Sequence, residues 1–424
     1  MRKLAAFLFS LSLLPAAPTE HLTLRQAEEI ALKNHPALQS AAAVERASLE
    51  ITKEMRSRYM PTVEGNITAA GTVSETSRIF AGFLNAPSLY DHVGLGVTVS
   101  QLISDFGRTG NLYSSAGLRA QAQGQATNTA RAQILLAVDQ SYFSVLRTRA
   151  VLRVAEQTVA ARQLVADQVT TLAQSKLKSQ LDVTFARVNL EEARLLLSSA
   201  QNDQRSALAA FSTALGTDVA SDYELAEEPV PSDLPPDSLP LVDLAYRQRP
   251  EARQADLELQ AAERFARAER ALSYPTLSAV ANAGGAPVHP DQFEAGWGAA
   301  GINLQIPVFN GGLFSARRAE AEARTEAARQ VAREVHNRIA RDVRVAYLAA
   351  RDAFERLRLT AELLAEAGES LKLAQARYDL GLGSIVELSQ AQLNVTRAQI
   401  AQASAKFDYQ TQRSVLSFES GDLK

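Results

Sequence analysis

Several short runs in the chain have residue types that could do enzyme chemistry, but none has the companions that this chemistry needs. Asp105-Phe106-Gly107 has the composition of a kinase magnesium motif, in which the aspartate holds the metal that bridges nucleotide phosphates. No catalytic loop or glycine-rich phosphate loop accompanies it. The run from Gly94 to Gly96 lacks the third glycine of a dinucleotide-binding fingerprint. We therefore expect that the chain is not an enzyme.

The sequence gives no better support for metal or thiol chemistry than for the enzyme motifs above. The chain has no cysteine, which excludes disulfides, thiolate metal ligands and cysteine nucleophiles. The five histidines are scattered without ligand spacing: His21, His35, His92, His289 and His336. The sequence thus predicts no catalytic residue, no cofactor and no metal site.

The N-terminal residues have the pattern of a secretory signal peptide. Arg2 and Lys3 precede an apolar run from residue 4 to residue 14, and Ala16 and Ala17 supply small residues for cleavage. We expect residues 1–17 to be this signal; the alternative is a cytosolic N-terminus that is apolar by chance. No later run reaches the ~18 apolar residues of a membrane-spanning helix.

Charge and composition narrow the function classes further. The 44 basic and 47 acidic residues give a formal net charge of −3, so no excess of positive charge favours nucleic-acid binding. Charged residues make up 21% and hydrophobic residues 46%, which is typical of a folded chain and not of a disordered tail.

The chain is an internal duplication. Pro36 and Pro61 recur after 214 residues as Pro250 and Pro275. Farther along, the displacement is 205, which relates a second set of pairs: Tyr142 and Tyr347, Ser179 and Ser384, Asp182 and Glu387, Ala186 and Ala391, Asn189 and Asn394, Ala193 and Ala398, Gly216 and Gly421. Two constant displacements indicate two copies of one unit separated by a single insertion or deletion.

Each copy ends in a very long helical stretch. Proline is absent between Pro87 and Pro229 and again after Pro307, and glycine is absent from residues 125 to 215 and from 313 to 367. Interior proline costs a helix ~3 kcal/mol and glycine ~1 kcal/mol, so these stretches favour uninterrupted helix. Apolar and small residues recur every 3.5 residues, from Ile134 to Val159 and from Val343 to Leu371, which predicts coiled packing against partner helices.

Between the helices, four runs have the alternation of β-strands. Residues 62–73 and 93–103 in the first copy, and 276–285 and 297–306 in the second, place apolar residues on one face and small or polar residues on the other. Runs of about ten such residues suit strands of an outer-membrane barrel, although half-buried soluble strands look similar. Aromatic residues at the strand ends suggest a membrane-interface girdle: Tyr59, Tyr90, Tyr274 and Trp297.

Four strands cannot close a barrel, because about eight is the smallest useful number. An open sheet edge in lipid leaves unpaired backbone groups that cost several kcal/mol each. If the strands span a membrane, several chains must therefore contribute to one barrel.

Two kinds of junction resemble those of the TolC-like outer-membrane efflux protein family. The strand-to-helix run Ile306-Pro307-Val308-Phe309-Asn310-Gly311-Gly312 is similar to the family's junction, and Leu102-Ile103-Ser104-Asp105-Phe106-Gly107-Arg108 is its first-copy counterpart. The turn from Tyr378 to Leu388 is similar to the family's second helical tip, and residues 176–183 form its counterpart. The resemblance covers nearly all of residues 22–421.

The resemblance implies a mainly α protein with membrane β: a long antiparallel α-helical barrel plus four strands per chain, which three chains combine into a 12-stranded outer-membrane barrel. It implies two tandem repeats, residues 18–216 with a hairpin at 109–216 and residues 250–424 with a hairpin at 312–420, joined by a proline-rich linker at 217–249. The implied homotrimer lies in the bacterial outer membrane with most of the chain in the periplasm. Its implied partners are a periplasmic adaptor, an inner-membrane pump and outer-membrane lipid.

The resemblance also implies a periplasmic gate at the helical tips. Asp182 and Glu387 fall at positions that family members use for constricting rings, and Tyr378 could hydrogen-bond Asp182 and hold the hairpins closed. Gln390 stands where a second acid can occur, which puts a strong charge-based closure in doubt. The alternative is that both acids are helix-capping residues that accept backbone N–H groups.

Four residues belong to the tip turns themselves. Gly381 and Gly383 allow the left-handed backbone values of a chain reversal, and the first copy has Lys176 and Lys178 there instead. The tip residues are also candidates for the adaptor contact.

Three functions compete. The first is a conduit for the efflux of small molecules in a tripartite pump, and the second is a conduit for type I protein secretion. The third, from another class, is a periplasmic coiled-coil scaffold or adaptor without channel activity, which would not need paired amphipathic strands in both copies.

Overall fold

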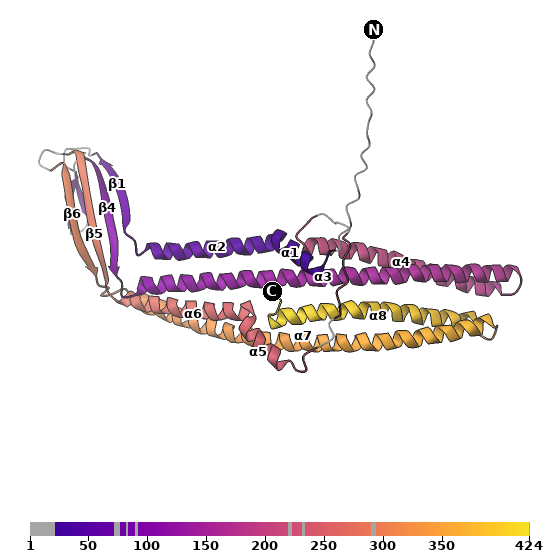
Figure 1. Cartoon of the computed structure of the whole chain (residues 1–424). Helices are drawn as coiled ribbons and strands as arrows, with labels where there is room; N and C mark the ends of the chain where they lie inside the picture. The colour runs from indigo at the N-terminus through magenta and orange to yellow at the C-terminus, as the bar shows by residue number, and fades with distance from the viewer. Residues whose placement is uncertain are drawn as a thin grey trace, which may run out of the picture.

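The computed structural model describes residues 22–71, 77–81, 84–89, 92–218, 223–230, 234–289 and 294–423, with only the backbone for 77–81, 84–89 and 92. The predicted signal peptide lies outside these residues. The molecule is long and narrow, with a β-sheet at one end and two helical hairpin tips at the other (Figure 1).

Two 67-residue helices run through both halves of the molecule, α3 (Arg108–Gln174) and α7 (Leu313–Asp379). At 1.5 Å per residue each is about 100 Å long. The shorter helices pack along them: α1 (Leu24–Asn34), α2 (Pro36–Ser57), α4 (Gln180–Ala214), α5 (Leu239–Gln248), α6 (Pro250–Arg270) with the 3₁₀ turn η1 (Ala271–Ser273), and α8 (Ile385–Ser420).

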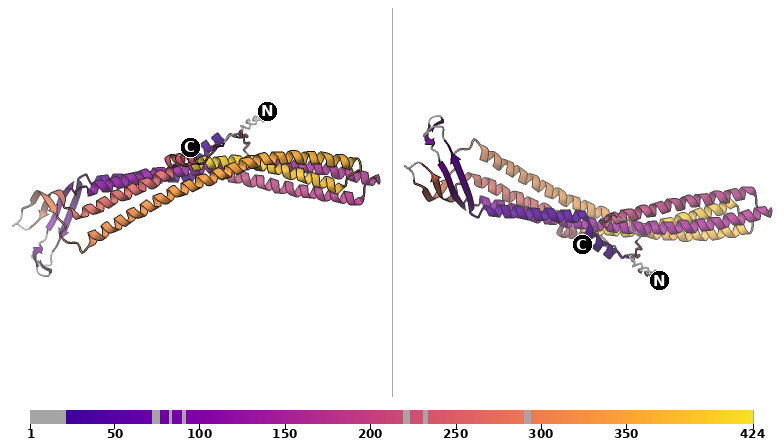
Figure 2. Two further views of the ribbon diagram at one scale, coloured as in Figure 1. Left: turned by 90° about the horizontal axis from the view of Figure 1, so that it is seen from below. Right: turned by 90° about the horizontal axis from the view of Figure 1, so that it is seen from above.

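These helices form four columns. α2 and α4 lie end to end beside α3, while α6 and α8 lie end to end beside α7, as the views in Figure 2 also show. α3 also packs on α6 and α8, which joins the two halves of the chain. None of the described helices is both long enough and apolar enough to cross a bilayer.

The apolar and small residues that recur every 3.5 positions form a packing seam, a stripe of residues along each long helix that contacts the neighbouring helices. In α3 every predicted seam residue from Ile134 to Val159 is buried or half-buried. In α7 the same holds for most of the run, but Phe354 and Ala361 are exposed in the single chain. The main core cluster lies at the middle of the molecule, where Tyr142, Phe211 and Leu215 pack between α1, α3 and α4.

The predicted linker at 217–249 contains a helix. α5 begins at Leu239, 215 residues after the start of α1 at Leu24, and buries Val242 and Ala245 against α7. The second repeat therefore begins near residue 239 and not at Pro250. Pro250 was a misleading boundary because it starts the next helix, α6, just as Pro36 starts α2.

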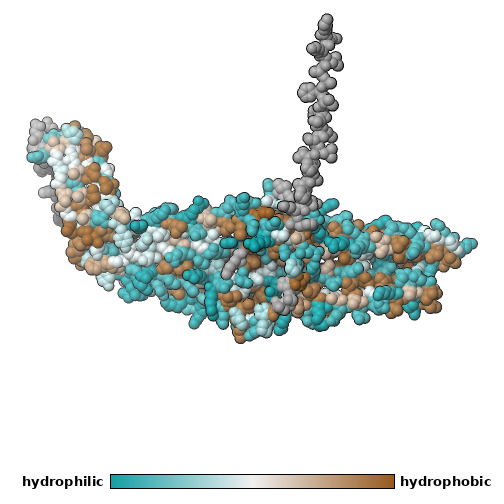
Figure 3. Space-filling model, viewed as in Figure 1, coloured by the Kyte–Doolittle hydropathy of each residue, from teal (hydrophilic) through white to brown (hydrophobic). Residues whose placement is uncertain are grey.

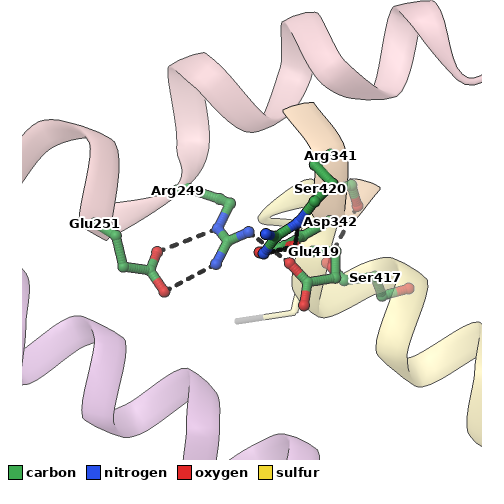
Figure 4. A network of polar contacts seen from close by, with 7 residues as sticks. All are labelled: Arg249, Glu251, Arg341, Asp342, Ser417, Glu419 and Ser420. Carbon is green, nitrogen blue, oxygen red and sulfur yellow. Dashed lines mark hydrogen bonds and ion pairs between the residues drawn. The ribbon is translucent and has the colours of Figure 1, made fainter. Parts of the chain in front are cut away.

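A buried ion-pair network fixes the joint between α5 and α6 (Figure 4). Arg249 donates to both carboxylate oxygens of Glu251, at 3.2 and 3.1 Å, and also to Glu419 near the end of α8. Burial alone would lower the pKa of Arg249, but these two carboxylates raise it. The corresponding position of the first repeat is His35, whose backbone lies against Gly216 just as that of Arg249 lies against Gly421.

The main sheet has four antiparallel strands in the order β1 (Thr62–Ala70), β4 (His92–Ser104), β5 (Thr276–Val288) and β6 (Gly296–Gln305). They correspond to the four predicted runs, with ends that differ by a few residues. A further hairpin, β2 (Ser77–Ala81) and β3 (Leu84–Leu89), lies between β1 and β4 and was not predicted. β1 and β6 are the two edges of the main sheet, and no other strand in the described part of the chain pairs with either edge.

The register sorts the side chains onto two faces. Residues paired across the four strands share a face, so Glu64, Thr98, Asn282 and Ala299 form one row of a largely polar face. The opposite face carries rows such as Val63, Val99, Ala281 and Ala300. This apolar face stays open to solvent in the single chain: Ile67 is 84% and Ile302 is 72% exposed. Figure 3 shows the hydrophobic residues gathered on one side of the sheet.

Candidate functional site

The two helical tips reverse the chain with the same backbone geometry. Lys176 and Gly381, 205 residues apart, both adopt left-handed values, with φ of 60° and 73°. In each turn the residue that follows the left-handed one closes the helix end with a backbone bond: Leu177 N–H donates to Leu172 O at 2.9 Å, and Leu382 N–H donates to Arg377 O at 2.8 Å. This six-to-one bond is the Schellman closure of a helix end.

The helices that leave the tips are capped by serine. Ser179 Oγ accepts from Asp182 N–H at 3.2 Å, and Asp182 Oδ2 accepts from the backbone and hydroxyl of Ser179 at 3.0 and 2.9 Å. Ser384 Oγ accepts from Glu387 N–H at 3.2 Å. The capping interpretation is therefore confirmed for Asp182, whose carboxylate satisfies the helix start.

The carboxylate of Glu387 has a different partner from the carboxylate of Asp182. Its Oε1 lies 3.0 Å from Nε of Arg377, which also donates to the carbonyl of Leu382 across the turn. Both side chains are about half exposed, so this pair adds no more than ~1 kcal/mol. Sequence reasoning missed Arg377, although its opposite charge ten residues before Glu387, on the other side of a turn, was a usable signal.

Tyr378 lies inside the tip and not on a free surface. It is 7% exposed and packs with apolar residues of both hairpins, among them Val169, Val183 and Leu388. Burial raises the pKa of its hydroxyl, and the charges of Asp182 and Asp379 raise it further. Lys178 Nζ lies 3.9 Å from the ring centroid, a cation–π contact that connects the two hairpins.

The predicted hydrogen bond between Tyr378 and Asp182 is wrong for the single chain. Tyr378 Oη has no hydrogen-bond partner among the described residues, and Asp182 Oδ2 accepts from Ser179 in its own helix cap. A polar link between the hairpins near the tips is instead Asn189 Nδ2 donating to Ser389 Oγ at 2.7 Å. The predicted gate residue Gln390 is exposed and donates to Asn394, one turn along the same helix.

The tips also carry exposed apolar side chains that nothing in the chain covers. These are Leu177 at 70% exposure, Leu181 at 63%, Leu380 at 74%, Leu382 at 69% and Val386 at 54%. They surround Lys176, Lys178, Gly381 and Gly383, the four residues predicted for the turn and the adaptor contact. Such a patch is typical of an interaction surface.

The two strand-to-helix junctions match residue for residue at a displacement of 205. Phe106 and Gly107 have φ of 51° and 88°, and Gly311 and Gly312 have φ of 62° and 85°. Asp105 Oδ2 accepts from Thr109 N–H at 2.7 Å, and Asn310 Oδ1 accepts from Phe314 N–H at 3.4 Å. The Asp-Phe-Gly run is therefore a helix start, and the exposed Phe309 precedes its counterpart.

The aromatic residues predicted for a membrane interface do not form one group. Tyr59 and Tyr274 lie at the helix end of the sheet and are 44% and 55% exposed. The ring of Tyr274 packs against that of Phe106 in a tilted arrangement, with ring centroids 5.9 Å apart. Tyr90 lies outside the described residues. Trp297 does not fit the prediction, because the register pairs it with Gly284 on the polar face, opposite to the face of Ile302. The nearness of Trp297 to a strand end was misleading, since alternation and not position decides the face.

Among the residues that the structure describes, no group of three or more His, Asp or Glu side chains is arranged to hold a metal ion.

Comparisons with known proteins were made for the sequence and for the fold. A family model described as "Outer membrane efflux protein" matches residues 29–217 and 241–421. The "Probable efflux pump outer membrane protein TtgC" of Pseudomonas putida is 28% identical over 330 residues, which cover 72% of this chain and 64% of that protein. The "Solvent efflux pump outer membrane protein SrpC" of Pseudomonas putida is 26% identical over 388 residues, covering 88% of this chain and 79% of that protein.

Solved structures share the whole fold. The outer membrane protein VceC from Vibrio cholerae superposes with a TM-score of 0.83 at 18% identity, over 94% of this chain and 96% of that one. The outer-membrane channel OprN gives a TM-score of 0.83 at 18% identity, over 94% and 89% of the two chains.

Proposed function

The chain belongs to the outer membrane efflux protein family, and from this premise we propose that it is an outer-membrane channel subunit, three copies of which form a conduit for the efflux of small molecules in a tripartite pump. The matched segment spans 64% of the length of the first relative, so the conduit, its cargo and its partners are proposals for this chain.

The observation that carries the proposal is a four-stranded sheet with two open edges, one polar face and one exposed apolar face. Backbone groups at an open edge must find partners in hydrocarbon, and four strands are too few to close on themselves. Pairing of β6 in one copy with β1 in the next removes every edge, and three copies of the four-stranded sheet supply twelve strands. The apolar face would then contact lipid and the polar face would line the channel.

The helices support the same assembly. α4 exposes Val188 and Leu195, at 51% and 72%, and α7 exposes Leu348 and Leu363, at 52% and 53%. The other described helices leave these apolar residues of α4 and α7 exposed. A ring of copies would bury them between the outer columns of neighbouring subunits.

The apolar patch at the tips is the proposed contact for a periplasmic adaptor, through which an inner-membrane pump would deliver cargo. A photo-crosslinker placed at Leu382 or Lys178 should capture the adaptor in the native host. The matched control for Leu382 is Leu195, which is about as exposed in the single chain but would face a sister subunit.

The channel itself is tested by fractionation and by electrical recording. The protein should sediment with outer membranes, migrate as three copies in detergent and give discrete single-channel currents in planar bilayers. A monodisperse monomer in buffer without detergent, or recovery in the soluble periplasm, would refute the channel and favour a scaffold.

A further inference from the structure

One large aromatic side chain lies on the polar face of the sheet. Trp297 is the second residue of β6, and its row across the sheet is Gly284 on β5, Gly96 on β4 and Asn66 on β1. The indole is 47% exposed although it lies against the strands. If the polar face lines the channel, as the proposed function requires, this indole projects into the lumen.

The sheet has a built seat for the indole. A Cβ added at Gly284 would lie 2.3 Å from Cζ2 of Trp297, one at Gly96 would lie 3.3 Å from the same atom, and one at Gly94 would lie 3.8 Å from Cη2. None of these three glycines has a positive φ. Their φ values do not require glycine, but a Cβ at Gly284 would also lie 2.6 Å from the carbonyl oxygen of Leu95, and one at Gly96 would lie 3.3 Å from that of Ala283, so the close approach of β4 and β5 favours glycine as well. The indole occupies the space that the missing side chains leave and spans from β6 across β5 to β4.

The charge on this face favours cations. On strands β1, β4, β5 and β6, the described side chains of the polar face include one carboxylate, Glu64, and no basic residue. Within one chain Glu64 lies on β1, at the opposite edge of the sheet from Trp297. Pairing of β1 with β6 of the neighbouring copy would bring Glu64 of one copy onto the strand beside Trp297 of the next. An exposed indole attracts cations through its ring, and a nearby carboxylate adds to that attraction.

We propose that Trp297 is a cargo-contact residue of the lumen, a seated indole that binds aromatic organic cations in transit through the barrel with the help of Glu64. The neighbouring residues on this face are small or polar, such as Asn282, Ala299 and Asn303. Trp297 is therefore the residue on which a planar aromatic solute can stack. The inference rests on the proposed channel, because a sheet that lined no lumen would meet no cargo.

The chain offers a direct test, since Trp297 is its one tryptophan and fluorescence excited selectively at tryptophan reports on this residue alone. Purified protein is reconstituted into vesicles that contain brominated phospholipid, and quenching is then measured with two aqueous quenchers, the aromatic cation N-methylpyridinium and the anion iodide. A lumen-facing indole should be quenched from water and spared by the brominated lipid. Quenching by N-methylpyridinium should exceed that by iodide by about two- to fivefold, and Glu64→Gln should reduce this ratio.

The matched control moves the indole to the other face of the same strand. In Trp297→Phe combined with Ile302→Trp, brominated lipid should quench strongly and the preference for the cation should vanish. In the otherwise unaltered protein, Gly284→Ala should displace the indole and shift its emission.

The outcomes separate the two hypotheses. Strong quenching of Trp297 by brominated lipid, or equal quenching by the two aqueous probes, would overturn the cargo-contact role while the channel stands. If the brominated lipid fails to quench the double variant as well, neither face meets lipid, and both the channel and the inference are wrong.

Discussion

Replacing Asp139 by asparagine should remove a pH-dependent loss of stability from the middle of the molecule. Asp139 lies on α3, is 2% exposed, and its Oδ1 has no hydrogen-bond partner among the described residues. Burial raises its pKa from 3.8 to about 7; a hydrogen bond with Ser414 lowers it, and the nearby Glu28 carboxylate raises it. Glu28 itself has a raised pKa, first because of burial.

The sign and size of this pH-dependent change in stability follow from the thermodynamic linkage between proton binding and folding. A carboxyl group whose folded pKa lies above its unfolded value adds stability that is complete below about pH 4 and is lost as the pH rises through about 7. The change from 3.8 to about 7 corresponds to roughly 4 kcal/mol in total, of which about 2 to 3 kcal/mol falls between pH 5 and pH 8. Asparagine cannot ionise, so Asp139→Asn should lack this loss.

The assay is guanidinium unfolding of the detergent-solubilised protein, followed by far-ultraviolet circular dichroism at pH 5 and pH 8. The free energy of unfolding of the wild type should fall relative to Asp139→Asn by about 2 to 3 kcal/mol per chain between the two pH values. Asp203→Asn, at an exposed site on α4, is the control and should show no such difference. A gap between wild type and Asp139→Asn that is equal at both pH values would refute the reasoning.

Three further predictions concern the tips and the ion-pair network around Arg249. Tyr378→Phe should leave the chain as stable or up to about 1 kcal/mol more stable, because it removes a buried hydroxyl without a partner; a large loss in thermal unfolding would show a missed hydrogen bond. Gly381→Ala should cost about 1 kcal/mol because φ is 73°, whereas Lys176→Gly at the equivalent turn should be neutral or slightly stabilising in the same measurement. Arg249→Met should cost roughly 3 kcal/mol in denaturant by leaving buried carboxylates unpaired, and adding Glu419→Gln should recover part of it; no recovery would mean that the pair is unimportant.

The long helices and the four main strands could be predicted because each depends on a local pattern that the sequence repeats twice. Absence of proline and glycine marks α3 and α7, and alternation marks the strands. The displacement of 205 even relates single backbone angles, such as those of Phe106 and Gly311. The β2–β3 hairpin was missed because residues 77–89 have no comparable alternation.

Side-chain partners could not be predicted from the same patterns. Asp182 had two plausible acceptor roles, and only the geometry of the turn shows that it caps α4 instead of meeting Tyr378. Trp297 was assigned to a membrane interface from its position, whereas its face depends on the register that pairs it with Gly284 on the preceding strand. Arg249 and Glu419 are 170 residues apart and meet only after both repeats have packed.

Because α3 and α7 are continuous helices, they determine how the proposed conduit could widen. From Asp139 at the middle to Gln174 near the tip, α3 has no break and extends roughly 50 Å. A tilt of 1° at the middle would therefore displace the tip by about 1 Å, with no residue along the way acting as a hinge. The tip would respond as the far end of a lever, so small rearrangements at the equator, where α1 and α5 meet the two long helices, would be amplified into movement of the entrance.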